Sequence, residues 1–162
     1  MQILKFTSEV EEYNHYNELL EEEQLLVKAA IKAADNAYAP YSGFSVGAAL
    51  LLQDGTVVTG SNQENVAYPS GLCAERTAMF WAGANHPQKA IVTLAIFAKS
   101  EDFEVVDPVY PCGSCRQVMS EYERIGKQPM RIIMTAATGK VHAVNGLINI
   151  LPVAFDADNL KR

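Results

Sequence analysis

All three cysteines of the chain lie in two short segments that could bind one metal ion together. Cys73 precedes Ala74 and Glu75, and Cys112 and Cys115 belong to the run Pro-Cys-Gly-Ser-Cys. Three thiolates can hold Zn²⁺ and leave the fourth tetrahedral position for water, which is the layout of a catalytic zinc site. Glu75 would then be a carboxylate beside that water, placed to transfer protons.

A structural zinc site is the alternative interpretation of the same cysteines. Such a site fills all four positions with protein ligands. His86 and His142 are candidates for the fourth ligand. A non-catalytic zinc-stabilised binding module of this kind would lose nothing when Glu75 is replaced by Gln. The position of Glu75, two residues after the first cysteine, favours the catalytic interpretation.

Composition and charge restrict the class of protein. A chain of 162 residues suggests one domain. The formal net charge of -6 disfavours a general nucleic-acid-binding protein, because phosphate contacts need clustered Lys and Arg. Three cysteines is an odd number, which suits a metal site in a reducing compartment better than a disulfide framework.

The chain shows no signal for membrane insertion or export. The apolar run at the start is too short and too soon followed by acids to be a signal peptide, and no apolar run approaches the length of a membrane span. We therefore expect a cytoplasmic protein.

Hydrophobic periodicity and turn signals predict the elements that must position the cysteines. Helices are expected over 21–37, 74–84 and 112–122, with a short one over 146–151. Strands are expected over 46–53, 56–61, 91–98, 131–134 and 140–144, and a further strand is plausible over 3–10. Asp54 and Gly55 predict a tight hairpin between the first two of the main strands.

This order of elements predicts an α/β protein with helices on both faces of a sheet. We expect an N-terminal extension over 1–20, either an edge strand or an arm, and a single domain over 21–162. Cys73 and Cys112 each lie where a helix begins. There the helix dipole and the free backbone N–H groups stabilise a thiolate.

Four ordered segments and the tail resemble a known family. They are Tyr38 to Ala49, Asn62 to Asn65, Cys73 to Arg76, Pro111 to Gln117 and the Leu-Pro tail that ends at Phe155. From Tyr38 to Phe155 the chain resembles a cytidine deaminase of the small, all-cysteine zinc type. The pattern of a three-ligand zinc with a non-ligand Glu as general acid and base belongs to zinc deaminases in general.

The resemblance implies a three-layer α-β-α fold with a mixed central sheet of about five strands. It also implies one Zn²⁺ per subunit, bound by Cys73, Cys112 and Cys115, with Glu75 as the catalytic residue. The implied reaction converts cytidine and 2′-deoxycytidine to uridine and 2′-deoxyuridine plus ammonia, for pyrimidine salvage. The implied assembly is a homotetramer whose active sites are shared between subunits.

Roles for further residues follow from the resemblance. Phe44 would pack on the pyrimidine face, Asn62 and Glu64 would hold the ribose 3′-hydroxyl, and Arg76 would hydrogen bond a ligand sulfur. Tyr68 and Phe155 match positions that reach a neighbouring active site, and Ala74 joins the substrate-binding residues. From the residues alone, Phe44 could be a core residue, Asn62 and Glu64 an exposed polar loop, and Arg76 a surface arginine.

Other substrates share the zinc motifs. A deaminase of another aminated heterocycle, such as a blasticidin-type nucleoside, has the same Cys-Ala-Glu and Pro-Cys-x-x-Cys elements. The set Phe44, Asn62 and Glu64 favours a plain nucleoside, and a nucleotide or RNA substrate is disfavoured because the chain has no basic run. The chain departs from the family in a longer N-terminal segment and an extended stretch from Glu101 to Tyr110, both of which bear on subunit contacts.

Overall fold

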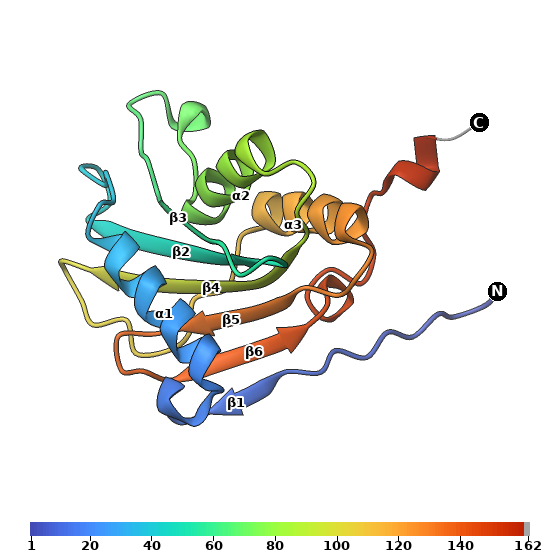
Figure 1. Cartoon of the computed structure of the whole chain (residues 1–162), viewed down its shortest axis with the longest axis horizontal. Helices are drawn as coiled ribbons and strands as arrows, with labels where there is room; N and C mark the ends of the chain where they lie inside the picture. The colour runs from blue at the N-terminus through green and yellow to red at the C-terminus, as the bar shows by residue number, and fades with distance from the viewer. Residues whose placement is uncertain (161–162) are drawn as a thin grey trace.

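The computed structural model describes residues 1–160, and within them one mixed sheet of six strands forms the centre of the fold (Figure 1). The strand order is β1-β6-β5-β4-β2-β3. β4 and β5 run parallel, and every other neighbouring pair is antiparallel. The strands are β1 (Glu11–Tyr13), β2 (Phe44–Leu52), β3 (Val57–Ser61), β4 (Ile91–Ser100), β5 (Arg131–Thr135) and β6 (Val141–Asn145).

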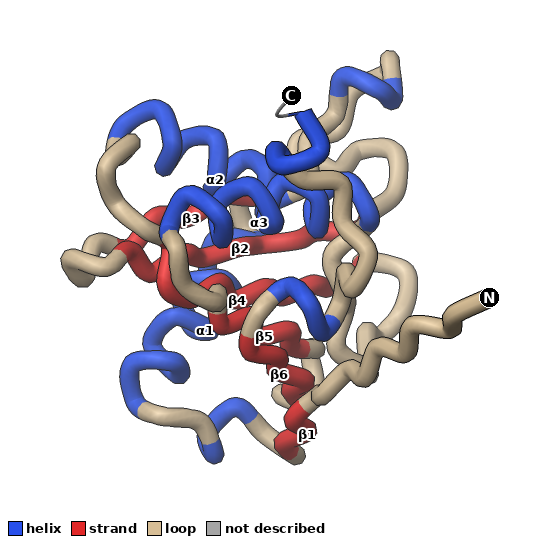
Figure 2. Tube along the Cα trace, turned by 90° about the vertical axis from the view of Figure 1, so that its right-hand side faces the viewer, coloured by secondary structure: helices blue, strands red, loops and turns tan. Residues whose placement is uncertain are grey.

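Three α-helices cover the two faces of this sheet. They are α1 (Glu21–Ala34), α2 (Ala74–Asn85) and α3 (Gly113–Gly126). α1 lies against one face, and α2 and α3 lie side by side on the other (Figure 2). Short 3-10 turns occur at Tyr16–Glu18, Tyr68–Ser70, Leu147–Asn149 and Ala157–Leu160. The predicted three-layer α-β-α fold is therefore confirmed, with one strand more than expected.

The central strand β4 shows why both faces need a helical cover. Leu94 and Ile96 are buried in the cluster under α2 and α3, whereas Ala95 and Phe97 are buried in the cluster under α1. Successive side chains of a strand point to opposite faces, so a continuous apolar run requires packing on both sides.

Gly60 allows β3 to pack directly against α2. A Cβ at this position would lie 2.6 Å from the backbone nitrogen of Ala78 and 2.8 Å from the carbonyl oxygen of Ala74. Real Cβ atoms do not approach backbone atoms so closely, so only glycine fits. This contact fixes the first two turns of α2 on the sheet, and those turns follow directly on Cys73.

The predicted strand over 3–10 is wrong. Residues 1–10 form no strand and expose their side chains, and the edge strand β1 begins at Glu11, where the chain pairs with β6. α1 also ends at Ala34, three residues early, because the Tyr38 backbone turns away to pair with the segment of Asn62 and Gln63.

The division into an extension over 1–20 and a domain over 21–162 stays a prediction. Tyr13, Tyr16 and Leu19 pack into the cluster beneath α1. Within the described part of the chain, none of the helices combines the length and apolar character that crossing a membrane requires.

Candidate metal centre and active site

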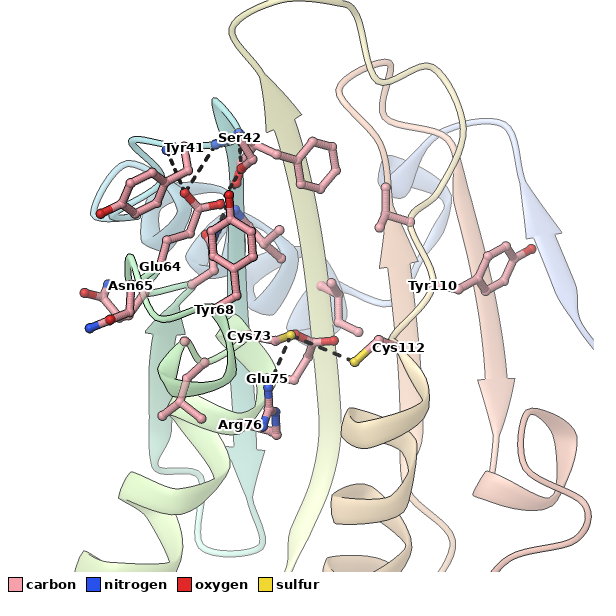
Figure 3. A pocket seen from close by; sticks show the side chains of 18 residues that line it. Tyr41, Ser42, Glu64, Asn65, Tyr68, Cys73, Glu75, Arg76, Tyr110 and Cys112 are labelled. Atoms are coloured by element: carbon pink, nitrogen blue, oxygen red, sulfur yellow. Dashed lines mark hydrogen bonds between the residues drawn. The ribbon is translucent and has the colours of Figure 1, made fainter.

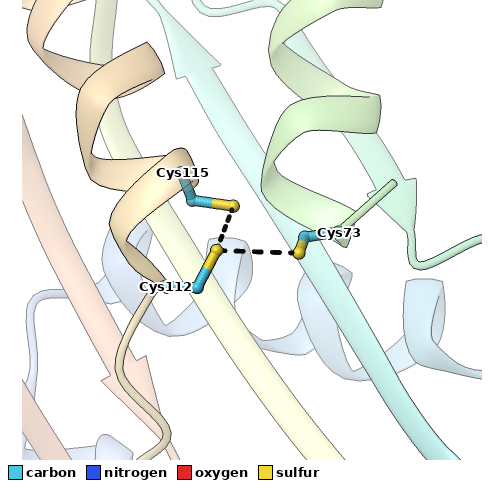
Figure 4. A group of neighbouring side chains, drawn as sticks. All are labelled: Cys73, Cys112 and Cys115. Carbon is cyan, nitrogen blue, oxygen red and sulfur yellow. Dashed lines mark hydrogen bonds between the residues drawn. The ribbon is translucent and has the colours of Figure 1, made fainter. Parts of the chain in front are cut away.

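The sulfur atoms of the three cysteines lie together between the starts of α2 and α3 (Figure 4). The Sγ atoms of Cys73 and Cys112 are 3.9 Å apart, and those of Cys112 and Cys115 are 3.6 Å apart. A tetrahedral zinc with Zn–S bonds of about 2.3 Å needs sulfurs about 3.8 Å apart. The number, chemistry and spacing of these donors therefore fit one zinc ion.

The two helices place the cysteines. Cys73 is the N-cap of α2 and Cys112 the N-cap of α3, and Cys115 lies in the first turn of α3. A hydrogen bond from the Cys115 thiol, assisted by one from Arg76, lowers the pKa of the Cys73 thiol to about 5. The pKa of Cys115 is raised, first by this shared bond with Cys73 and then by burial. The lowered pKa of Cys73 favours its thiolate, which is the form that binds a metal.

Glu75 lies in the first turn of α2 with 4% of its surface exposed. Burial raises the pKa of its carboxyl, and the negative charge of Cys73 raises it further. Figure 3 shows the Glu75 side chain beside Cys73, in the space that Cys112 borders from α3. A carboxyl group whose protonated form is favoured in this way can hold and release a proton next to the metal centre.

A cavity of about 750 Å³ opens over these residues. Of the predicted substrate-binding residues, Phe44, Asn62, Glu64 and Tyr68 line it, and Ala74 and Phe155 do not. The Ala74 side chain is fully buried. The predicted zinc and catalytic residues that line it are Cys73, Cys112 and Glu75, together with Arg76.

Asn62 and Glu64 hold the segment that enters β2. The Asn62 side chain donates to the Phe44 carbonyl at 2.9 Å and accepts from the Val46 N–H at 2.7 Å. Glu64 accepts from the Ser42 hydroxyl at 2.5 Å and from the Tyr41 N–H at 2.9 Å (Figure 3).

These donors lower the pKa of Glu64, with the Ser42 hydroxyl as the largest cause. Glu64 is therefore an ionised acceptor at neutral pH. A carboxylate has about four acceptor positions, so Glu64 can also accept from a ligand hydroxyl.

Phe44 is the first residue of β2, and its ring stacks on Phe103 with centroids 6.3 Å apart. Phe103 belongs to the loop after β4 and is 60% exposed. The sequence analysis did not identify Phe103, because one aromatic residue among loop acids carries no periodic signal. It also missed Ser42, whose bond to Glu64 spans 22 residues.

Tyr68 and Phe155 are exposed, with relative exposures of 77% and 61%. Tyr68 lines the cavity near Tyr41, with ring centroids 6.2 Å apart. Phe155 is held at its backbone, where its carbonyl accepts from the Gln117 side chain at 2.7 Å. Their contact with a neighbouring subunit stays a prediction.

The histidines considered as a fourth ligand lie elsewhere. His142 binds Glu12 and Tyr110, and His86 packs beside Trp81 with ring centroids 5.5 Å apart. Among residues 1–160, the three cysteines are the complete group of candidate ligand side chains at this centre. This leaves one coordination position without a protein side chain, as a catalytic site requires.

Comparisons with known proteins agree with this geometry. The family model described as "Cytidine and deoxycytidylate deaminase zinc-binding region" matches residues 20–131. The cytidine deaminase of Halalkalibacterium halodurans is 39% identical over 138 residues, which cover 85% of this chain and 97% of the relative. That of Sporosarcina psychrophila is 40% identical over 136 residues, which cover 84% of this chain and 93% of the relative.

A solved structure extends the agreement to the fold. The cytidine deaminase from Burkholderia pseudomallei superposes with a TM-score of 0.70 at 39% identity, covering 81% of this chain and 97% of that one. The matched family is a zinc-binding one, and the three-sulfur cluster fits one zinc per chain as predicted. The resemblance drawn from the motifs is thus confirmed, and the chain belongs to the cytidine and deoxycytidylate deaminase family.

Proposed function

We propose that this protein hydrolyses cytidine and 2′-deoxycytidine to uridine and 2′-deoxyuridine, releasing ammonia. The observation that carries the proposal is a buried carboxyl group, Glu75, beside three converging cysteines at the floor of a cavity. Its volume of about 750 Å³ is ample for a nucleoside. The names of the relatives support the same reaction.

The chemistry needs a nucleophile at C4 of the base and proton delivery to N3 and the leaving amine. Zinc, when bound by Cys73, Cys112 and Cys115, acidifies a water molecule to a pKa of about 7. Glu75 takes one proton from the water and passes it to N3. It then takes the second proton from the hydroxyl added at C4 and passes it to the amine, which leaves as ammonia while C4 becomes a carbonyl. Its raised pKa suits this role, because the carboxyl must be protonated in part of the cycle.

The remaining pocket residues bind and orient the nucleoside. Phe44 packs on the pyrimidine face, and Asn62 and the ionised Glu64 hold the ribose 3′-hydroxyl. Ala74 is fully buried and does not line the cavity, so its contact with the base stays a prediction.

The first test is cytidine turnover by the purified protein, followed by the ultraviolet change as the amine is lost. We expect Glu75→Gln to keep its zinc and to lose about a hundred- to ten-thousand-fold in kcat, the usual contribution of general acid–base catalysis. Zinc content measured on the same samples separates loss of the proton carrier from loss of the metal. A zinc-loaded wild type that turns over neither cytidine nor a panel of aminated bases would indicate a zinc-stabilised binding module instead. A Glu75→Gln protein with full turnover would show that Glu75 is not the proton carrier.

A substrate panel separates the enzyme alternatives. Wild-type protein that holds zinc and spares cytidine, but deaminates a blasticidin-type nucleoside, would assign the site to another aminated heterocycle. The amide of Asn62 and the carboxylate of Glu64, which lie together at the cavity, favour a ribose-bearing substrate.

We also propose that the enzyme works as a homotetramer in the cytoplasm, with nucleosides as its ligands and neither nucleic acid nor membrane as partner. The exposed Tyr68 and Phe155 support a site completed by a second subunit. Three free thiols suit a reducing compartment, and the net charge of -6 disfavours nucleic acid. Light scattering of the purified protein checks the assembly.

A further inference from the structure

A chain of polar contacts runs from the edge strand β1 to the loop that ends at Cys112. Glu12 lies opposite His142 in the pairing of β1 with β6, and its carboxylate accepts from His142 Nε2 at 2.7 Å. The second ring nitrogen, Nδ1, is hydrogen bonded to the Tyr110 hydroxyl. Because a carboxylate can only accept, Nε2 carries the proton and a neutral His142 accepts the Tyr110 O–H.

A second branch starts from the same carboxylate. Lys140 Nζ lies 3.5 Å from Glu12 Oε2 and 3.1 Å from Asp107 Oδ1. Asp107 and Tyr110 belong to one loop, which the sequence analysis noted as extended. We call the five residues Glu12, His142, Tyr110, Lys140 and Asp107 the Glu12 network.

The loop borders both the metal centre and the cavity. Its last residues, Val109 and Tyr110, line the cavity next to Cys112, which follows after one proline. Figure 3 shows the Tyr110 side chain pointing away from the other labelled pocket residues. The Tyr110 side chain therefore serves the Glu12 network, while the adjoining backbone forms a wall of the cavity.

Two backbone contacts attach the earlier part of the loop without the help of Glu12. The Val105 carbonyl accepts from the Ala137 N–H at 3.1 Å, and the Val106 carbonyl accepts from the Thr138 hydroxyl at 3.0 Å. Between Asp107 and Cys112 the loop is held by the side chains of the Glu12 network, by the buried Pro108 and Pro111, and by Arg116, whose Nε donates to the Pro111 carbonyl at 2.8 Å. This is the stretch that forms the cavity wall.

We propose that Glu12 is a positioning residue for the active site, acting through His142 and Lys140 on the loop that carries Val109, Tyr110 and Cys112. The edge strand β1 lies outside residues 20–131, which match the family model. Substrate affinity and zinc retention would then depend on a strand that contributes no residue to the cavity. The effect on affinity rests on the proposed function, whereas the effect on zinc retention does not.

The chain offers a matched control in the neighbouring residue. Glu11 also makes short ionic contacts from β1, but with Arg131, which in turn binds Glu23 of α1. Adjacent residues of a strand point to opposite faces of the sheet. Glu11→Ala therefore loosens β1 without touching the loop, and Glu12→Ala releases the loop as well.

The experiment compares Glu12→Ala, Tyr110→Phe and Glu11→Ala as purified, zinc-loaded full-length proteins. Four quantities are measured: KM and kcat for cytidine, the rate of zinc release to a chromogenic chelator, and the midpoint of thermal unfolding. Because the contacts of Glu12 are partly exposed, we expect Glu12→Ala to raise KM and zinc release about two- to fivefold. kcat should change less, since Glu75 is carried by α2. Tyr110→Phe should act in the same direction.

Three further results complete the test. Glu11→Ala should lower the unfolding midpoint and leave KM and zinc release unchanged. The double variant Glu12→Ala/Tyr110→Phe should change KM and zinc release no more than the stronger of the two single variants does. The reason is that both substitutions break the same chain of contacts through His142. Glu12→Gln keeps an acceptor for His142, so its KM should stay close to the wild-type value.

Equal effects of Glu11→Ala and Glu12→Ala on KM and zinc release would overturn the proposal, as would the absence of any effect of Glu12→Ala on both. A wild-type protein that does not act on cytidine would refute the proposed function instead. In that case the zinc-release rates of the three variants still decide whether Glu12 positions the loop.

Discussion

Arg76 compensates part of the charge at the metal centre. Three thiolates and one Zn²⁺ carry a formal net charge of about -1, which weakens the metal as a Lewis acid. Arg76 Nη2 lies 3.7 Å from Cys73 Sγ, and this contact with Cys73 raises the pKa of the guanidinium. Its Nε is buried and has no hydrogen-bond partner within the described residues. Since an unpaired buried donor costs about 1–3 kcal/mol, the benefit of an arginine here comes from its charge.

We expect Arg76→Ala to lower zinc affinity or turnover by about ten- to a hundredfold, the usual effect of removing a group that supports a metal ligand. Chelator competition measures the affinity, and cytidine turnover at saturating zinc measures the remaining effect on chemistry. Arg76→Lys is the control for charge, because it keeps the cation and loses the planar guanidinium. Unchanged zinc affinity and turnover in Arg76→Ala would show that Arg76 only packs beside the metal centre and does not support it.

At the scale of elements, β1 is attached on both faces of the sheet. On one face Arg131 of β5 binds both Glu11 carboxylate oxygens at 2.7 Å and Glu23 of α1 at 3.0 Å. On the other face Glu12 binds His142 of β6. A strand of three residues makes few backbone hydrogen bonds with its neighbour. These side-chain contacts therefore supply much of the energy that holds β1 on the sheet.

The Glu11 contact predicts a dependence of stability on pH. The Arg131 guanidinium, and next the Tyr13 hydroxyl, lower the pKa of Glu11 from 4.5 to about 2. A carboxyl group with a depressed folded-state pKa stabilises the fold above its unfolded pKa and loses that contribution as the pH falls through the folded value. The Glu11 contribution is therefore complete above about pH 4.5 and disappears toward pH 2.

Thermal unfolding of wild type and Glu11→Gln at several pH values tests this dependence. Because the Glu11 side chain is 49% exposed, its contribution is at most about 1 kcal/mol. That corresponds to about 2–4 °C in unfolding midpoint for a chain of this size. The difference between the two proteins should be present at pH 7 and shrink as the pH falls below 4.5. A difference that persists unchanged at pH 2.5 would contradict it.

At the scale of the whole molecule, periodicity and motifs predicted the three layers of the fold. They did not predict the features that depend on contacts between segments far apart in the sequence. Apolar runs such as 91–98 and the hairpin signal at Asp54 and Gly55 are local, so their elements follow from the sequence. The strand β1 does not, because Glu11 and Glu12 resemble solvated acids until Arg131 and His142 lie beside them. The stacking of Phe103 on Phe44 likewise joins two segments with no shared pattern.

The proposed shared active site can be tested by mixing two variants that are each impaired for a different reason. Glu75→Gln lacks the proton carrier, and Phe155→Ala lacks the ring proposed to reach a neighbouring site. If that ring is buried in the neighbouring site, its removal should lower kcat/KM about tenfold or more. If Phe155 serves a second subunit, a hybrid site can combine Glu75 from one chain with Phe155 from another.

Random reassembly of equal amounts of the two variants should yield intact hybrid sites at about a quarter of all positions, since each of two independent conditions is met half the time. Cytidine turnover at low substrate concentration should therefore rise well above the mean of the separate variants after the subunits exchange. A mixture without subunit exchange is the control. Turnover that stays at the mean after proven exchange would assign Phe155 to its own chain, and the cavity of each subunit would then be complete in itself.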